Sequence, residues 1–381
     1  MTSGRCRSEA RIDLQAVRDN VAALAARAAG GAQVMAVVKA DGYGHGLVPC
    51  ARAAVQGGAS WLGVAFLEEA LALRDAGLDV PVLAWLMVPD EDLAPAVSAA
   101  VDLSVDDLPQ LDRVRAAARA TGTPARVQLK IDTGLSRAGA TVREWPDLCA
   151  AAARAEAGGE LRVTGVWSHF AFADGGPDHP VNGAQAAVFA EALEVVDRAG
   201  LTPDVRHLAN SAATLTAPAT HYDLVRPGLA CYGLSPVPDL GAPADFGLRP
   251  AMTLLSTVAL VKRVPAGTGV SYLHRHVTAA EATLARVPLG YADGVPRSAT
   301  GVAQVLLRGR RRTIAGTVCM DQFVLDLGDD AVEAGDEVLL FGPGDAGEPT
   351  AQDWARLLGT IDYEIVTRIG ARVPRTYVGG R

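Results

Sequence analysis

The sequence predicts an α/β fold in two parts: a (βα)8 TIM barrel over residues 1–245 and a mostly antiparallel β domain over residues 246–381. Three observations predict it. Short apolar runs alternate with longer helical patterns in the first part, which is typical of a parallel barrel. A stretch rich in proline and glycine, 235–250, then interrupts the chain, and β-rich runs follow it. Finally, 381 residues exceed what one hydrophobic core usually organises.

Eight apolar runs are candidate strands of the barrel. Between them, apolar residues recur at helical spacing. The alternative is an open doubly wound sheet, but no GxGxxG motif follows an early strand, so a dinucleotide-binding fold is disfavoured. The expected strands are 33–39, 61–66, 81–86, 102–105, 126–132, 161–169, 205–209 and 223–226.

The second part is expected to contain one helix among strands. Residues 351–358 have the helical pattern, and Thr350 precedes them as an N-cap. The β-rich runs are 252–264, 282–287, 303–307, 313–318, 323–327 and 338–341.

Composition excludes several classes of protein. The net charge is −8 and the Lys and Arg residues are scattered, which disfavours a nucleic-acid or anionic-membrane surface. The N-terminus is polar and no run of about 18 apolar residues occurs, so a membrane protein is not expected. Widely spaced cysteines without a CxxC pair indicate free thiols in the cytoplasm and argue against disulfides and a metal site. They are Cys6, Cys50, Cys149, Cys231 and Cys319.

The first strand ends at a lysine, Lys39, followed by a loop with three glycines and Tyr43. An amine at a strand end with an apolar stem loses stability in its ammonium form, so Lys39 is a candidate Schiff-base nucleophile. The alternative is a lysine whose stem packs while its amine reaches water. Other expected strand ends carry polar side chains as well, and catalysis in barrels takes place at these ends. They are Lys130, Arg137, His169, His207, Asn210, Ser211 and Arg226.

The loops after the seventh and eighth strands are expected to form a phosphate site. Ser211 offers a hydroxyl, and Gly228 and Leu229 offer backbone N–H groups. A lysine facing a phosphate site across a barrel indicates pyridoxal 5′-phosphate as the cofactor. The alternative for Ser211 is ordinary helix capping.

The β domain contributes a second set of candidates: Tyr272, Tyr291, Met320 and Tyr363. A tyrosine is a poor base at its usual pKa of about 10. It becomes useful where neighbouring groups favour the phenolate. Each tyrosine alone is also explained as a packed aromatic with a satisfied hydroxyl.

Taken in order, these motifs resemble those of bacterial alanine racemase, a fold-type III pyridoxal-phosphate enzyme. The resemblance runs from about Arg11 to Arg375, and the ordered set is its specific feature. It implies interconversion of L-alanine and D-alanine, which supplies peptidoglycan, by a homodimer with shared active sites. The motifs are AVVKADGYGHG, DTGLSRAG, HFAFAD, HLANSAA, RPGLACYG, GVSY, LGYADG, GTVCMDQ and DYE…RVPR.

The resemblance also implies roles for the site residues. Lys39 would hold the cofactor and act as one base, and Tyr272 of the partner subunit would be the second. Arg226 would face the pyridine nitrogen, supported by His169 and His207. Arg137 and Met320 would bind the substrate carboxylate. Asn210 would also bind the cofactor, and Lys130, at a position that is carbamylated in some members, Tyr291 and Asp321 would have supporting positions. The phosphate would be held by Tyr43, Ser211, Gly228, Leu229 and Tyr363.

One departure and three alternatives accompany the resemblance. The family commonly has glycine after GVSY, whereas this chain reads Leu273, His274, Arg275, His276, which bears on substrate range. A racemase of broader specificity is one alternative. A decarboxylase of the same architecture is another, because Cys319 precedes Met320. A non-enzymatic cofactor-binding protein is the third, although that type lacks the β domain.

Overall fold

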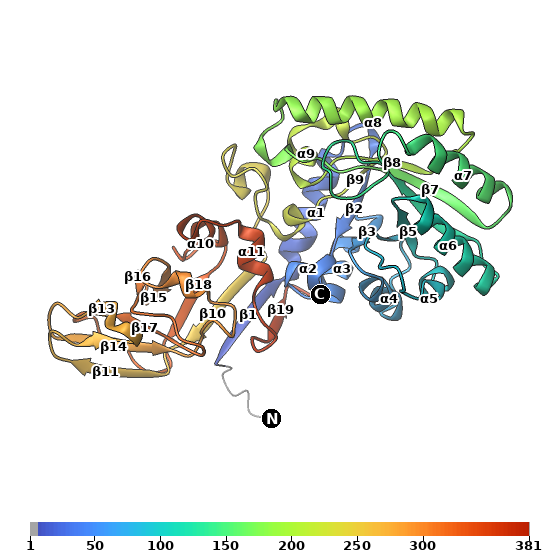
Figure 1. Ribbon diagram of the computed structural model, residues 1–381. Coiled ribbons are helices and arrows are strands. Elements are labelled where there is room, and N and C mark those ends of the chain that lie inside the picture. The colour runs from blue at the N-terminus through green and yellow to red at the C-terminus, as the bar shows by residue number, and fades with distance from the viewer. Residues whose placement is uncertain (1–6, 381) are drawn as a thin grey trace. The chain divides into compact units, whose positions relative to one another are not determined.

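The computed structural model describes residues 7–380, which form two compact units (Figure 1). The barrel unit comprises Val17–Gly42 and Leu47–Leu248. The β unit comprises residues 7–16, Tyr43–Gly46 and residues 249–380. The first strand, β1 (Ser8–Asp13), therefore belongs to the β unit, whereas the sequence prediction includes it in the barrel domain.

The barrel unit contains eight parallel strands, one at each predicted run. Their order is β8-β7-β6-β5-β4-β3-β2-β9. The two ends of this sheet meet, because Asp223 donates its backbone N–H to the Arg206 carbonyl (3.0 Å) and Arg226 to the Ala209 carbonyl (2.9 Å). The predicted barrel is thus confirmed. The strands are β2 (Gln33–Val37), β3 (Trp61–Val64), β4 (Val82–Ala84), β5 (Asp102–Val105), β6 (Ala125–Lys130), β7 (Leu161–Trp167), β8 (Val205–His207) and β9 (Leu224–Val225).

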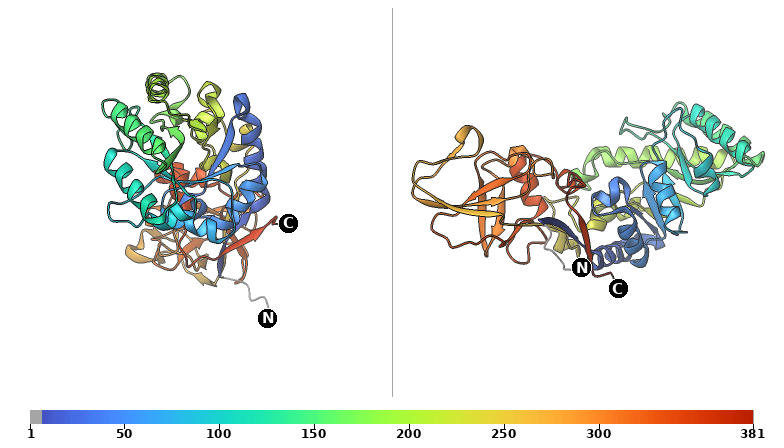
Figure 2. Two further views of the ribbon diagram at one scale, coloured as in Figure 1. Left: turned by 90° about the vertical axis from the view of Figure 1, so that its right-hand side faces the viewer. Right: turned by 90° about the horizontal axis from the view of Figure 1, so that it is seen from below.

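Helices surround these strands, as the views of Figure 2 show. Their ends follow local signals: Asp107 accepts the Gln110 N–H at the start of α6, and Gly122, with φ of 66°, ends that helix. The interior is filled by a cluster that includes Met35, Trp61 and Trp167. The helices are α1 (Leu14–Arg27), α2 (Lys39–Tyr43), α3 (Leu47–Gln56), α4 (Leu67–Asp75), α5 (Ala94–Ser98), α6 (Leu108–Thr121), α7 (Trp145–Ala157), α8 (Pro180–Arg198) and α9 (Ser211–Thr216).

The β unit is built on a nine-stranded sheet of order β11-β14-β17-β16-β15-β18-β10-β1-β19. Its pairs are antiparallel except β1 with β19, and β1 lies between β10 and β19. A separate hairpin joins β12 (Gly269–Val270) to β13 (His276–Val277). The other strands are β10 (Met252–Thr257), β11 (Leu260–Val264), β14 (Ala282–Val287), β15 (Gln304–Leu307), β16 (Arg310–Ala315), β17 (Phe323–Asp326), β18 (Glu337–Phe341) and β19 (Arg375–Val378).

The β unit contains two α-helices, so the expectation of a single helix is wrong. Helix α10 (Ala351–Leu358) has the predicted bounds, and the Thr350 hydroxyl accepts the Asp353 N–H at 3.0 Å. Helix α11 (Asp362–Thr367) is additional. It spans only six residues and opens without a side-chain cap, so neither a periodic pattern nor a start signal marks it in the sequence.

Four cysteines lie in the described part of the chain, and all four are free thiols: Cys50, Cys149, Cys231 and Cys319. Cys6 lies outside the described residues. Between residues 7 and 380, no helix is both long and apolar enough to cross a membrane.

Candidate active site

Lys39 follows β2 at the carboxyl end of the barrel strands, as predicted. Its Nζ lies 5.8 Å from the centre of the Trp85 ring. Burial lowers the pKa of Lys39, the charge of Arg137 lowers it further, and Glu69 opposes both effects. The ammonium form is therefore disfavoured, which is the property expected of an amine that reacts with a carbonyl group.

The turn after Lys39 is left-handed. Ala40, Asp41 and Gly42 have φ values of 54°, 53° and 60°. For a residue with a side chain this conformation costs roughly 1–2 kcal/mol. Hydrogen bonds hold the turn: Ala40 donates its N–H to Glu69 Oε1 (2.6 Å), and Asp41 Oδ1 accepts the Leu47 N–H (2.8 Å). Such a strained conformation persists only where contacts with the surrounding structure hold it, and strained residues are concentrated at functional sites.

Arg226 is buried at the end of β9, where it brings together two of the predicted histidines. Nη1 donates to His207 Nδ1 (3.0 Å), and Nη2 lies 3.3 Å from His169 Nδ1. Nη2 also donates to the carbonyls of Ser168 (2.6 Å) and Leu208 (3.1 Å). Burial lowers the pKa of Arg226 to about 9 and holds the pKa of each histidine well below its usual value. Neutral imidazoles therefore accept hydrogen bonds from a buried guanidinium.

The Trp167 ring contacts two cationic side chains of the candidate site. Lys130 Nζ lies 4.3 Å from its centre and Arg226 Cζ 4.9 Å, and the His207 ring stacks on it at 5.8 Å. Burial lowers the pKa of Lys130 to about 8, and Asp106 opposes this shift. Sequence reasoning missed Trp167, although it lies two residues before His169 in the motif WSHFAFAD.

Ser211 joins the loops that follow the seventh and eighth strands. Its Oγ accepts the backbone N–H of Gly228 (2.8 Å) and of Ala230 (3.4 Å). Asn210 precedes it as the N-cap of α9, and its Oδ1 accepts the Ala213 N–H at 3.0 Å. The predicted loops therefore lie together. Leu229, buried, begins the 3-10 helix η4 (Leu229–Tyr232) directly after them.

Arg137 lies on an ordered loop after β6. Asp132 Oδ1 accepts the N–H groups of three successive residues, 134–136, at 2.9 to 3.1 Å. Arg137 itself is exposed. Its charge lowers the pKa of both Lys39 and His169, so its position is one from which it acts on the candidate site.

Tyr43 and Tyr363 both belong to the β unit, where their ring centres lie 6.1 Å apart. The glycines after Tyr43 allow close packing within this unit. A Cβ on Gly44 would meet the Val366 carbonyl oxygen at 2.6 Å, and the Gly44 carbonyl accepts from Arg375 Nε at 3.0 Å. Glycine at position 44 is therefore required by backbone contact as well as by its φ of 79°.

Tyr272 begins the 3-10 helix η6 (Tyr272–His274) at the tip of the β12–β13 hairpin, and its side chain is 69% exposed. The flanking residues Ser271 and Leu273 have φ values of 60° and 62°. Thr317 holds the turn, because its hydroxyl donates to the Tyr272 carbonyl (2.7 Å) and its own carbonyl accepts from Ser271 Oγ (2.6 Å). The base predicted from GVSY is thus presented on a strained, tethered turn.

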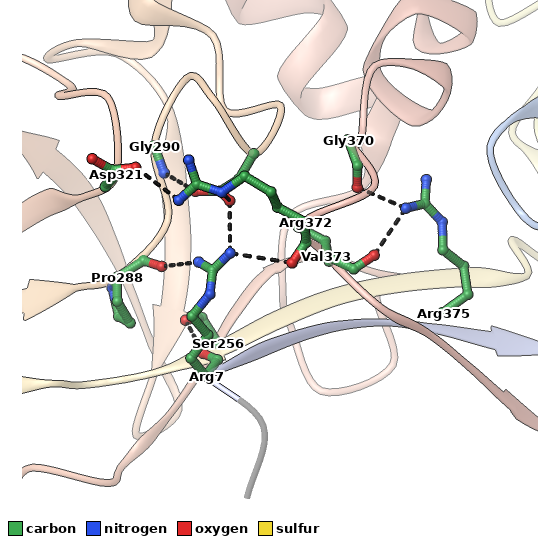
Figure 3. A network of polar contacts seen from close by, with 10 residues as sticks. Arg7, Ser256, Pro288, Gly290, Asp321, Gly370, Arg372, Val373 and Arg375 are labelled. Carbon is green, nitrogen blue, oxygen red and sulfur yellow. Dashed lines mark hydrogen bonds and ion pairs between the residues drawn. The ribbon is translucent and has the colours of Figure 1, made fainter.

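Tyr291, Met320 and Asp321 are brought together by backbone contacts. Tyr291 donates its N–H to the Cys319 carbonyl, and Ala292 donates to the Met320 carbonyl, both at 3.0 Å. Asp321 Oδ1 accepts from Arg372 Nη2 at 2.7 Å, in the network that Figure 3 shows. Both Tyr291 and Met320 are exposed. The motifs LGYADG and GTVCMDQ therefore form one surface of the β unit.

A buried aspartate holds this surface in place. Asp293 accepts from Arg7 Nη2 (2.8 Å) and the Gly290 N–H (3.0 Å), and it pairs with Arg372. Arg7 also donates to the Pro288 carbonyl at 2.7 Å (Figure 3). The turn that carries Tyr291 is thus tied to the N-terminal segment of the chain.

The comparisons with known proteins agree with this arrangement. Residues 12–236 match the family model "Alanine racemase, N-terminal domain", and residues 251–377 match "Alanine racemase, C-terminal domain". The chain is 67% identical to an alanine racemase of Frankia casuarinae over 372 residues, which cover 98% of this chain and 96% of that protein. It is 59% identical to one of Streptomyces coelicolor, with 98% and 96% coverage.

Solved structures give the same result. The alanine racemase of a D-cycloserine-producing Streptomyces lavendulae has a TM-score of 0.97 at 56% identity, covering 100% of this chain and 99% of that one. The enzyme of Bacillus anthracis with bound L-Ala-P has a TM-score of 0.90 at 36% identity, with 100% and 97% coverage. Family models, relatives and structures agree over nearly the whole chain, and the chain belongs to the alanine racemase family.

Proposed function

We propose that this chain is a pyridoxal-phosphate-dependent alanine racemase that interconverts L-alanine and D-alanine and supplies D-alanine for peptidoglycan. The observation that carries the proposal is the presence, at the carboxyl ends of the barrel strands, of both Lys39, whose pKa is lowered by burial, and a buried Arg226 that contacts two histidines. The names of the relatives support alanine as the substrate.

The residues of the barrel unit fit the cofactor. Lys39 would bind its aldehyde carbon, and Arg226 would face its ring nitrogen. Ser211 accepts two N–H groups, and its own hydroxyl proton finds no acceptor among the described residues, so it can donate to a phosphate oxygen. Gly228 and Leu229 would complete the phosphate site within this unit. Tyr43 and Tyr363 are proposed as phosphate-binding residues on the resemblance of their motifs.

Racemisation requires that the α-proton leaves one face of the substrate and returns to the other. When bound, the cofactor's conjugated ring takes up the electron pair that the departing proton leaves behind. Lys39 exchanges the proton at Nζ on one face, where its lowered pKa makes the neutral amine accessible. Tyr272 of the partner subunit exchanges a proton at its hydroxyl on the other face. Arg226 remains a hydrogen-bond donor.

We also propose a homodimer in which Tyr272 and Met320 complete the active site of the partner subunit, Met320 binding the substrate carboxylate together with Arg137. Their exposure in the single chain, 69% and 54%, supports this arrangement. The domain boundary near 245/246 and a cytoplasmic location remain predictions from the sequence.

A racemisation assay over several amino acids tests the function. The parent should convert L-alanine to D-alanine, whereas Lys39→Ala and Tyr272→Phe should each lose most of this rate. Comparable rates for other amino acids would favour the broader-specificity alternative, and release of CO2 would favour a decarboxylase. If the parent binds the cofactor but releases no D-alanine, the enzyme proposal is wrong.

A further inference from the structure

One strand of the barrel, β6, carries a row of polar side chains. Arg126, Gln128 and Lys130 alternate along β6 and therefore share one face. The interiors of such barrels are normally filled by branched apolar residues, as Leu83 and Val205 illustrate here. Lys130 belongs to the candidate site, but the proposed function gives no role to Gln128, which is fully buried.

Gln128 is held at one end by a buried carboxylate. Asp102, also fully buried, accepts from Gln128 Nε2 at 3.0 Å. Arg126 Nε and Thr164 Oγ1 also donate to Asp102, each at 2.5 Å. With these three donors, the charge of Asp102 is paired and hydrogen-bonded despite its burial.

Irregular pairing between β6 and β7 makes these contacts possible. The register shifts between Val127 and Gln128, so that Thr164 has no partner across the ladder. A bulge of this kind turns a side chain to a new direction, and the Thr164 hydroxyl reaches both Asp102 and the Val127 carbonyl. The next residue, Gly165, leaves room for the amide, since a Cβ there would lie 2.8 Å from Gln128 Cδ.

The hydrogen-bond chain from Asp102 to Arg226 has only one consistent arrangement of protons. A guanidinium donates and never accepts, so His207 Nδ1 must carry the lone pair that Arg226 meets at 3.0 Å. The proton of the neutral ring is then on Nε2, which donates to Gln128 Oε1 at 2.7 Å. The amide NH2 consequently faces Asp102. A flipped amide would place two donors together at His207 and two oxygens together at Asp102.

We propose that Asp102, Gln128 and Thr164 are positioning residues that fix the Nε2–H tautomer of His207 and thereby orient Arg226. The inference rests on the proposed function only for the role of Arg226. Gln128 is the critical residue of the three. Its amide nitrogen donates to the Asp102 carboxylate, which leaves its amide oxygen to accept the N–H of the His207 imidazole. Without Gln128, a buried N–H loses its partner and Arg226 loses a fixed acceptor.

Histidine-selective 15N NMR tests the tautomer directly, in both cofactor-free and cofactor-loaded protein. The His207 signals, assigned by their loss in His207→Gln, should show a protonated Nε2 and an unprotonated Nδ1, unchanged across neutral pH. In Gln128→Met, which keeps the side-chain length, the Nε2 proton should exchange faster and the two-signal pattern should broaden. The kcat of the loaded enzyme should fall about tenfold, with KM changed less.

Two controls separate positioning from folding. Gln304→Met makes the same substitution in β15 of the β unit and should leave signals and kcat unchanged. If Gln128→Met fails to fold, Thr164→Val tests the same hydrogen bonds, since it removes the hydroxyl at similar volume. Thr164→Ser, which keeps the hydroxyl, should restore the parental pattern of His207 signals.

The outcomes distinguish the two proposals. An inactive parent with the expected His207 signals would refute the racemase function but support the positioning role of Asp102, Gln128 and Thr164. An active parent whose His207 is protonated on Nδ1 would overturn the proposed positioning role. The positioning role would also be wrong if Gln128→Met, or Thr164→Val in its place, kept the His207 signals and the kcat of the parent.

Discussion

The carboxylate of Glu69 accepts a hydrogen bond from the backbone N–H of Ala40, with 2.6 Å between Oε1 and the nitrogen. Its second oxygen accepts the N–H groups of Ala65 (2.9 Å) and Phe66 (3.2 Å) at the start of α4. One side chain thus ties the strained turn after Lys39 to the start of α4. Its charge also raises the pKa of Lys39 against the effects of burial and Arg137.

We expect Glu69→Gln to make the Lys39 amine more reactive while weakening the turn. The amide has no charge, so the pKa of Lys39 should fall further, and more of the amine is neutral at a given pH. It also offers one acceptor oxygen in place of two, which should cost about 1 kcal/mol of stability. Reductive methylation of cofactor-free protein, followed by peptide mass spectrometry, measures the reactivity. Glu68→Gln, at the exposed neighbouring position, is the control, and equal reactivity in both variants would contradict the prediction.

Lys130 should make stability depend on pH in the alkaline range. Its pKa is about 8 in the native state against 10.5 for a free side chain. Between these values the unfolded chain holds a proton that the native state has released, so the free energy of unfolding rises with pH, by up to about 3 kcal/mol. Below about pH 8 both states are protonated and the contribution stays constant.

Lys130→Met should remove that rise. Urea unfolding of parent and variant at about pH 8 and about pH 10 gives the comparison, in buffers free of CO2 because a neutral amine also adds CO2. The stability of the parent relative to the variant should increase with pH. A difference that does not change with pH would show that Lys130 keeps an ordinary pKa.

Gly165→Ala should destabilise the barrel unit. The added Cβ would overlap the Gln128 amide, and overpacking of this kind costs about 1–3 kcal/mol. Gly183→Ala is the matched control: this glycine lies within α8 with open space around its Cβ position, so the change should stabilise by about 0.5–1 kcal/mol. Thermal unfolding measures both. Similar melting temperatures would mean that Gln128 moves aside without cost.

Leu273→Gly should be tolerated or stabilising, although it removes a large side chain. Leu273 is 75% exposed and has φ of 62°, so little apolar burial is lost and backbone strain is relieved. The strain is worth about 1–2 kcal/mol and the added flexibility of glycine costs about 0.5–1 kcal/mol. Leu273→Val, β-branched at the same position, should lower the melting temperature. If glycine destabilises more than valine, the strain account of this turn is wrong.

Local patterns were sufficient to predict the eight barrel strands and several elements of the β unit from the sequence. The runs 102–105, 282–287 and 351–358 have the same bounds in the structure as in the prediction. Buried parallel strands are continuous apolar runs, and Thr350 is a direct start signal for α10. Polar residues at the strand ends likewise indicated Lys39, Arg226 and Ser211 as candidate site residues.

Features that depend on distant partners were not predictable. Strand β1 has only Ala10 and Ile12 as buried apolar residues, and its pairing partners begin more than 200 positions later. Ala40 and Asp41 adopt a left-handed conformation that their residue types disfavour, because contacts from elsewhere hold them there. Gln128 belongs to no motif; its role follows from a register shift between strands, which no single segment encodes.

The place of β1 in the sheet has a consequence for protein synthesis. This strand is synthesised before both of its neighbours, β10 and β19, and β19 ends at Val378. The sheet of the β unit therefore cannot close around β1 until β19 has been synthesised. A fragment that begins at Arg249 would expose two unpaired strand edges, which favours aggregation. Deletion of β1 or of β19 should thus impair the same sheet.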